Sequence, residues 1–279
     1  MKARLALRFE AAGQGTRLRV DTQEPPWKVI RAFPQANGGA LVHLHNVSGG
    51  ILAGDLLSLQ MEVGCGARAQ VTTTGATRLY RHRPGAACSE QRTEIFVAEG
   101  GLLEYLPDPL IPFGRSRHTQ RTAVQLASGA RFFWWEIVAP GRQAMGELFA
   151  FDSLRIDTSV SSALRPLMIE RFLLEPGVRM LRSAARTGPY LYNATFCAIQ
   201  VGRTMSDLRE LESLLAESTR TATCPGVMMW GASALAADGV IVRGLSTTAR
   251  GLPATLAQFW SIARRFLTGE EAVPPRKLK

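Results

Sequence analysis

Apolar residues occupy every second position in many short segments of the chain, which is the pattern of a strand that buries one face. In residues 57–63 the apolar positions hold Leu57, Leu59, Met61 and Val63. The same character marks residues 5–9, 40–45, 68–74, 91–98, 119–126, 130–138, 166–174, 195–201 and 239–245. Glycine, proline, asparagine and serine separate these segments. The pattern predicts a mainly β protein, built as a layered, barrel or β-helical stack of many short strands. No fixed-length repeat is visible, which argues against a regular solenoid.

Two segments in the C-terminal third change to helical spacing. Residues 206–218 place leucines at positions 208, 211 and 215 on one stripe, with Asp207 near the start, where the helix dipole favours an anion. Residues 253–267 begin at Pro253 and are followed by Gly269. Both segments are predicted to be amphipathic helices packed on the sheets. No linker separates two units, so we expect one domain over residues 1–279, with a mobile or partner-ordered end at 270–279.

Composition narrows the class of protein. Hydrophobic residues make up 46% of the chain, enough for a folded core, and the net charge is +10. Only four of the 33 basic residues are lysines, so 29 are arginines, which suits interfaces and buried pairs or reflects the bias of the source genome. No apolar run reaches the ~18 residues of a membrane span, and the N-terminus lacks the apolar stretch of a secretory signal.

The four cysteines are scattered and form no C-x-x-C motif. They indicate neither a disulfide framework nor a zinc cluster, and we expect reduced core cysteines in a cytoplasmic protein. His43 and His45, two apart on a predicted strand, point to one face, either as a metal pair or as ordinary strand histidines. Asp55, after Gly50 and Gly54, is expected to cap a glycine-rich turn, and no P-loop motif is present.

Two acidic residues stand in strongly apolar segments. Glu170 lies between Met168 and Phe172, in a strand with apolar residues on both faces, so we expect a buried carboxylate whose pKa is raised unless a cation or hydrogen-bond donor compensates. The adjacent Arg171 points to the opposite face and is not its expected partner. Glu136 follows four aromatic residues and repeats the situation. Each acid is either half of a structural ion pair or a functional group.

Two generic functions stay open from these residues. A carboxylate pair in a β-rich core also suits a carbohydrate-active enzyme, although no aromatic sugar groove is apparent. The basic stretch at residues 78–83 is the best candidate for nucleic-acid binding, but no reader motif surrounds it, and a solvated or protein-binding loop is the simpler interpretation.

Several ordered blocks together resemble one family. Residues 49–55 read GGILAGD, residues 72–81 TTTGATRLYR and residues 103–107 LEYLP; Trp135-Glu136, Gly141-Arg142 and Gly146-Glu147 follow, and then Glu170-Arg171. These blocks resemble the urease accessory protein UreD, called UreH in some bacteria. The chain departs from the family pattern at Ala53, Arg78 and Tyr105 and lacks the family's P-R-x-W finish.

The resemblance implies a chaperone without catalytic activity of its own. Such a protein binds apo-urease and UreF, recruits the GTPase UreG through UreF, and helps deliver Ni²⁺ to the urease active site, with a dimer expected within the UreD–UreF complex. No cofactor is held stably and Ni²⁺ is only in transit; no nucleic-acid or membrane partner is expected. The implied fold is a β-helical stack with two helices.

The resemblance also implies an internal passage lined by acids and hydroxyls, which carried over by motif are Asp55, Thr77, Glu136 and Glu170. Sparse carboxylates and hydroxyls release Ni²⁺ sooner than imidazole or thiolate ligands do. The remaining motif positions, expected to be structural, are Gly49, Gly50, Gly54, Tyr80, Arg81, Glu104, Gly141, Arg142, Glu147 and Arg171.

Overall fold

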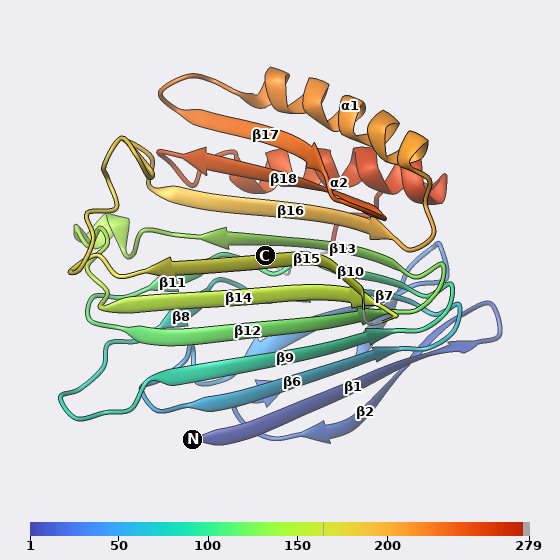
Figure 1. Cartoon of the computed structure of the whole chain (residues 1–279). Coiled ribbons are helices and arrows are strands. Elements are labelled where there is room, and N and C mark those ends of the chain that lie inside the picture. Colours follow the sequence, from blue (N-terminus) through green and yellow to red (C-terminus); the bar gives the residue numbers. More distant parts are fainter. Residues whose placement is uncertain (164, 276–279) are drawn as a thin grey trace.

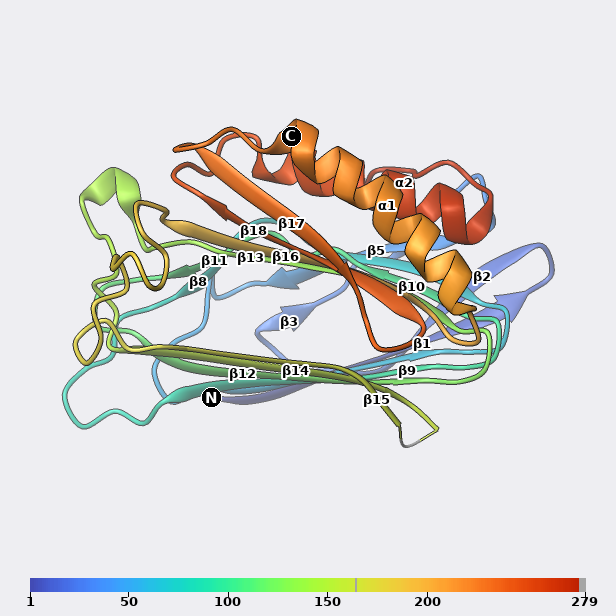
Figure 2. The same ribbon diagram turned by 45° about the horizontal axis from the view of Figure 1, so that its top comes forward.

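A computed structural model describes residues 1–163 and 165–275 as two stacked β-sheets with two helices on the outer face of one of them (Figures 1 and 2). The first sheet contains, in spatial order, β15 (Arg165–Leu174), β14 (Ser153–Ser162), β12 (Arg117–Leu126), β9 (Ser89–Val97), β6 (Leu56–Val63), β1 (Lys2–Ala12) and β2 (Gly15–Gln23). The second contains β17 (Met228–Ala234), β18 (Gly239–Ser246), β16 (Tyr192–Gln200), β13 (Arg131–Val138), β10 (Leu102–Tyr105), β7 (Arg68–Thr73), β5 (Ala40–Asn46) and β3 (Trp27–Lys28). Paired alongside it are β4 (Ala32–Pro34), β8 (Thr77–Leu79) and β11 (Leu110–Pro112).

The middle of the chain winds between the sheets as a β-helix does. It passes from β6 to β7, from β9 to β10 and from β12 to β13, and in each sheet the successive strands pair in parallel. The three crossings use equivalent turns, in which Gly66, Gly100 and Gly129 adopt positive φ. The turns stack, because Gly66 N donates to Glu99 O at 3.0 Å and Gly100 N to Ser128 O at 3.2 Å. Antiparallel strands at both ends complete mixed, unclosed sheets, so the layered, mainly β prediction is confirmed.

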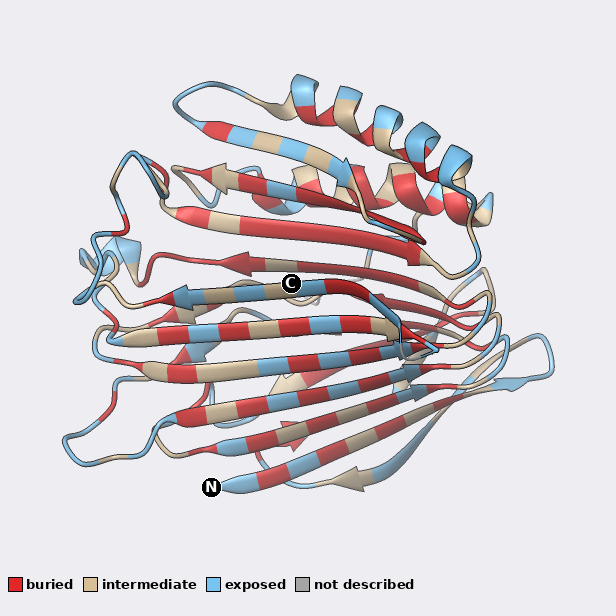
Figure 3. Cartoon of the chain, in the orientation of Figure 1, coloured by how far each residue is buried: buried red, intermediate tan, exposed pale blue. Residues whose placement is uncertain are grey.

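Two cores follow from the alternation along each strand, which Figure 3 shows as alternating buried and exposed positions. On β13, Phe132 and Trp134 join the core between the sheets, whereas Phe133 and Trp135 join the core beneath the helices. Helix α1 (Met205–Ala222) starts at Thr204, whose side chain accepts from Asp207 N, and α2 (Leu252–Thr268) ends at Gly269, in the left-handed conformation. Both predicted helices are confirmed.

The strand prediction is wrong in one instructive place. β15 was expected to be buried on both faces, but Ile169 and Leu173 on its outer face are 59% and 56% exposed. The reason is that nothing in the described chain covers the outer face of the first sheet, whereas the two helices cover the outer face of the second (Figure 2). The cysteines differ too: Cys197 is buried, whereas Cys65, Cys88 and Cys224 are exposed, and all four are free.

Candidate functional site

A row of polar side chains crosses the inner face of the first sheet. The strand register pairs Thr93 with Thr122, Thr122 with Thr158, and Thr158 with Glu170. The three threonines are buried. Among the described residues, the hydroxyls of Thr93 and Thr158 have no hydrogen-bond partner. Because a buried polar group without a partner is costly, these hydroxyls set the row apart from the apolar positions around it.

A second polar pair lies beside this row. Gln91 on β9 pairs in register with Gln120 on β12, one inward position away from Thr93 and Thr122. From the opposite sheet, Glu136 on β13 accepts a hydrogen bond from Gln120 Nε2 at 2.5 Å. Burial raises the pKa of Glu136 to about 7, the Gln120 hydrogen bond lowers it, and the charge of Glu170 raises it further. The carboxylate is therefore poised to gain or lose a proton near neutral pH.

A cavity of about 240 Å³ opens at this point between the sheets. Its walls include Thr77 and Glu136 from the second sheet and Gln91, Gln120 and Thr122 from the first. The lining also contains residues of the first two sequence blocks, Gly49, Gly50, Thr73, Thr74, Gly75, Ala76 and Arg78. Such a space, with oxygen and amide groups on several sides, suits water or a hydrated cation.

The structure does not bring all four predicted passage residues to this cavity. Thr77 and Glu136 line it, whereas Glu170 lies at the end of the threonine row, where Arg243 on β18 grips its carboxylate with contacts of 3.1 and 2.7 Å. Asp55 is buried elsewhere, and accepts from the Met1 ammonium at 3.0 Å and from Leu52 N at 2.9 Å. The turn-capping prediction for Asp55 is thus confirmed, and Glu170 is found in an ion pair with Arg243.

The first two sequence blocks pack directly on each other. Leu79 forms a β-bridge with Ile51, and the Tyr80 hydroxyl donates to Gly49 O at 3.3 Å. A Cβ on Gly50 would come within 2.5 Å of Arg78 O, so only glycine fits there. Arg78 Nη1 also donates to Gly49 O, at 3.2 Å. Arg78, one of the three arginines in the basic stretch at 78–83, thus supports the turn.

An ion pair and a close backbone contact account for the next motif residues, Gly141, Arg142 and Glu147. Arg142 pairs with Glu147 through two contacts, one of them 2.9 Å from Nε to Oε2, and Gly114 N donates to the same carboxylate at 3.0 Å. The Arg142 hydrogen bond holds the pKa of Glu147 at about 2. Gly141, at φ 135°, has no room for a Cβ, which would lie 2.7 Å from Glu147 O. These residues hold the 3₁₀ turn at Gln143–Met145 against β11.

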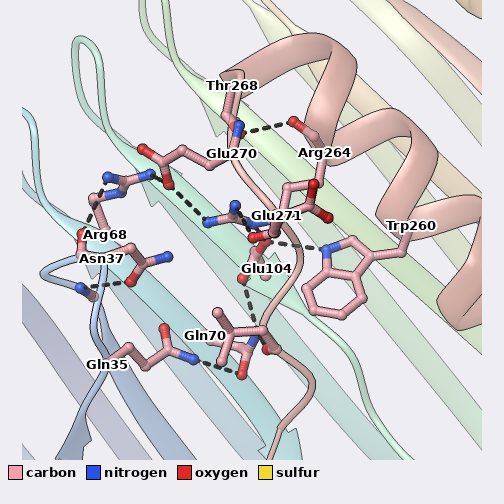
Figure 4. A network of polar contacts seen from close by, with 12 residues as sticks. Gln35, Asn37, Arg68, Gln70, Glu104, Trp260, Arg264, Thr268, Glu270 and Glu271 are labelled. Carbon is pink, nitrogen blue, oxygen red and sulfur yellow. Dashed lines mark hydrogen bonds and ion pairs between the residues drawn. The ribbon is translucent and has the colours of Figure 1, made fainter.

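Glu104 lies on the other side of the second sheet, beneath α2 (Figure 4). Its Oε1 accepts from Arg264 Nε at 2.8 Å and from Trp260 Nε1 at 3.0 Å, and its Oε2 accepts from Gln70 Nε2 at 2.9 Å. Burial raises the pKa of Glu104, against the opposing effects of Arg264, Gln70 and Trp260. This family-motif residue therefore anchors α2 to the sheet.

The same network reaches the C-terminal segment. Glu270 bridges Arg68, at 2.6 Å, and Arg264, at 3.3 Å, and Val273 O accepts from Gln70 Nε2 at 3.0 Å. These contacts hold the start of the predicted mobile end against the second sheet. Residues 276–279, the remainder of that end, lie outside the described residues.

The other motif positions have simpler placements. Gly54 adopts φ 76° in the turn before Asp55, and Arg81 is exposed, where its charge helps to lower the pKa of Glu147. Arg171 is exposed on the outer face of β15, opposite Glu170 as expected.

The histidines offer little to a resident metal. Within residues 1–163 and 165–275 no group of three or more His, Cys, Asp or Glu side chains is placed to hold a metal ion. His43 packs edge-on to Phe33 at 5.6 Å between ring centroids, and burial lowers the pKa of His45. In the same part of the chain no helix is long and apolar enough to cross a membrane.

Sequence reasoning missed most of the polar row. Thr93, Thr122, Thr158, Gln91 and Gln120 stand at inward positions of alternating strands, where a polar residue in place of an apolar one was the available signal. β14 was not predicted as a strand at all, although it alternates Leu154, Ile156, Thr158 and Val160.

Comparison with known proteins matches the sequence to one family. The family model for the UreD urease accessory protein matches residues 1–279. The urease accessory protein UreD of Herpetosiphon aurantiacus is 41% identical over 278 residues, covering 100% of this chain and 96% of that protein. Those of Dechloromonas aromatica and Pseudomonas aeruginosa strain UCBPP-PA14 are each 33% identical, covering 98% of this chain and 93% of the relative.

Proposed function

Because the chain belongs to the UreD family of urease accessory proteins, and so has a role in urease maturation, we propose that it carries Ni²⁺ through the space between its two sheets. The observation that supports this proposal is the polar cavity that Thr77 and Glu136 line inside an otherwise apolar sandwich. In this proposal the protein is a chaperone that acts on apo-urease, and it binds UreF and, through UreF, UreG, with a dimer within the UreD–UreF complex.

The donor set of the cavity suits transit rather than storage. It offers hydroxyls, amides and two carboxylates, those of Asp108 and Glu136, with no histidine or cysteine in its lining. Oxygen ligands of this kind hold Ni²⁺ weakly, so the cation exchanges with water and moves on. The raised pKa of Glu136, about 7, lets the group take a proton when no cation is present and release it when a cation arrives.

The threonine row supplies a route out of the cavity. Thr122 lines the cavity, and the row continues through Thr158 to Glu170 at the edge of the first sheet. There the Arg243 guanidinium forms an ion pair with the Glu170 carboxylate. In this proposal Glu170 exchanges the guanidinium for the cation, so the pair acts as a gate at the end of the passage. Asp55, outside the cavity, keeps the N-terminus and the turn before β6 in place.

The competing carbohydrate-active enzyme, with Glu136 and Glu170 as its carboxylate pair, draws no support from this geometry. Hydrolysis of a glycosidic bond needs two carboxyl groups facing one sugar. Arg243 engages Glu170 through both oxygens, and Glu170 does not share the cavity that Glu136 lines.

The experiment is co-expression with urease, UreF and UreG, scored for complex assembly, urease nickel content and urease activity. Thr122→Val and Thr158→Val keep the side-chain volume but remove the hydroxyls, and Glu136→Ala removes the carboxylate. We expect each variant to assemble normally and to lower nickel content and activity, as should Glu170→Ala.

The matched control is Glu94→Ala, because Glu94 follows Thr93 on β9 and points outward. It should activate urease as the wild type does. Normal nickel loading by a Thr122→Val, Thr158→Val, Glu136→Ala triple variant would eliminate the passage while leaving the role in maturation intact.

A further inference from the structure

The two sheets end at different places, and this mismatch leaves an apolar groove. The first sheet stops at β15, whereas the second continues past β18 to β17. The groove, about 700 Å³ in volume, is lined by residues of β15, β17 and β18 and by the segment between β15 and β16. It is separate from the cavity at Glu136, with which it shares no lining residue.

The floor of the groove is the part of the inner face of β17 and β18 around Met229, Gly231 and Leu245, beside the edge strand β15. Met229 on this face is 49% exposed, and Leu245 lies beside it. A Cβ on Gly231 would meet nothing within 4 Å, so the floor has open space. Trp230, which lies between Met229 and Gly231 in sequence, points to the opposite face of β17 and packs on Phe259 with ring centroids 5.0 Å apart. One more strand beside β15 would cover this floor.

The rim of the groove carries unneutralised positive charge. Its lining contains four arginines, Arg171, Arg179, Arg186 and Arg243, against one acid, Glu175. Arg243 is paired with Glu170. In the described part of the chain neither Arg171 nor Arg179 makes an ion pair, and the Arg186 side chain donates only to Met180 O, at 3.3 Å. Large exposed apolar side chains adjoin the rim, namely Ile169, Leu173, Val178 and Met180.

From these features we infer that the groove binds an extended, acidic segment of a partner protein, which adds a strand beside β15. An edge strand offers backbone donors and acceptors to such a segment, and pockets for alternate side chains supply specificity. The apolar side chains of the segment would rest on Met229 and Leu245, and its carboxylates would face Arg171, Arg179 and Arg186.

Charge decides against a second copy of this chain as the occupant. Two β15 edges brought together would place the same arginines opposite one another, on molecules that each carry a net charge of +10. Like charges across an interface cost affinity and slow the encounter. An acidic segment has the opposite property, and its binding should weaken as salt rises.

The inference concerns binding of a partner segment and not nickel transit, and its test requires no nickel. The probe is a fluorescein-labelled ten-residue peptide alternating leucine or valine with glutamate, titrated with the full-length protein and followed by anisotropy. We expect binding that weakens with salt, and at least tenfold weaker binding of a peptide carrying lysine in place of glutamate. Hydrogen exchange should slow in β15 when the acidic peptide binds, and remain unchanged in β2, the other edge of the sheet.

Two variants separate charge from shape. Arg179→Glu with Arg186→Glu should weaken binding at least tenfold, whereas the matched change of Arg4 and Arg17 to glutamate, on β1 and β2, should not. Gly231→Leu fills the open floor and should also abolish binding, with thermal unfolding unchanged. Wild-type binding by both the Arg179→Glu, Arg186→Glu variant and Gly231→Leu would overturn the inference. Protection of β2 from hydrogen exchange in place of β15 would do the same. So would a groove-dependent dimer of the protein alone.

Discussion

Arg264 on α2 donates from Nε to Oε1 of Glu104 on β10 at 2.8 Å, and 160 residues of sequence separate the two. Both side chains are at most 2% exposed. An ion pair in such surroundings has lost its hydration on both sides, so each charge depends on the other. Arg264 and Glu104 thus fix α2 to the second sheet. Removing either side chain leaves the charge of the other buried and unpaired, which lowers stability.

Removing one half of this pair should be strongly destabilising. Arg264→Met leaves the Glu104 carboxylate buried without its cation, and we expect a loss of about 3–5 kcal/mol in the free energy of unfolding, measured with urea. The neighbour Arg265 provides the control, because it is 66% exposed and pairs with the equally accessible Glu271. Arg265→Met should cost no more than about 1 kcal/mol. Similar losses for the two variants would contradict this reading, as would a Glu104→Leu, Arg264→Met double variant less stable than Arg264→Met alone.

Glu136 should make stability depend on pH near neutrality. Its pKa of about 7 lies above the ordinary value of 4.5, so between these limits the folded protein holds a proton that the unfolded chain has released. The stability contributed by this group is therefore complete below pH 4.5 and is lost as the pH rises through 7. In urea unfolding at pH 5 to 8, the free energy of unfolding of the wild type should fall relative to that of Glu136→Gln as the pH rises. A difference that stays constant with pH would show that Glu136 does not titrate in this range.

Breaking the Glu170–Arg243 pair should affect function more than stability. The Arg243 side chain is 57% exposed, so the pair resembles a surface salt bridge, and Glu170→Gln should change the free energy of unfolding by less than about 1 kcal/mol. Urease activation in the co-expression assay should nevertheless fall, because the end of the passage loses its charge. Arg243→Lys tests the same point, since a lysine lacks the two-pronged geometry. A large loss of stability with either variant would make the pair a structural element instead.

His118 should make the protein sensitive to acid. Its ring is buried with Nδ1 3.0 Å from Ser89 Oγ, and burial, with a smaller effect from His82, lowers its pKa to about 3. Between pH 6.5 and 3 the unfolded chain binds a proton that the folded protein excludes, so stability falls as the pH falls. His118→Gln should show a shallower decline over this range in urea unfolding. Parallel curves for the wild type and the variant would show that the acid sensitivity arises elsewhere.

Local patterns were enough to predict both helices and most of the long strands, although β2, β14 and β17 were missed. The two-residue period of residues 57–63 and the helical stripe at Leu208, Leu211 and Leu215 each report the burial of one face, which every residue in the segment shares. The turn glycines were also visible, because a positive φ at Gly66, Gly100 and Gly129 favours that residue type. The winding itself was not, since its coils differ in length and leave no fixed repeat.

The sequence alone therefore determined most of the long strands, the apolar face of each of these, and which acids stand among apolar neighbours. Only the tertiary structure decided what those acids meet. Glu170 finds Arg243 from a strand 73 residues away, and three threonines line up because parallel register places them at one level. β15 turns out to be an edge, which no local pattern records. Pairing and register depend on contacts between distant segments, whereas periodicity depends only on the residues within one.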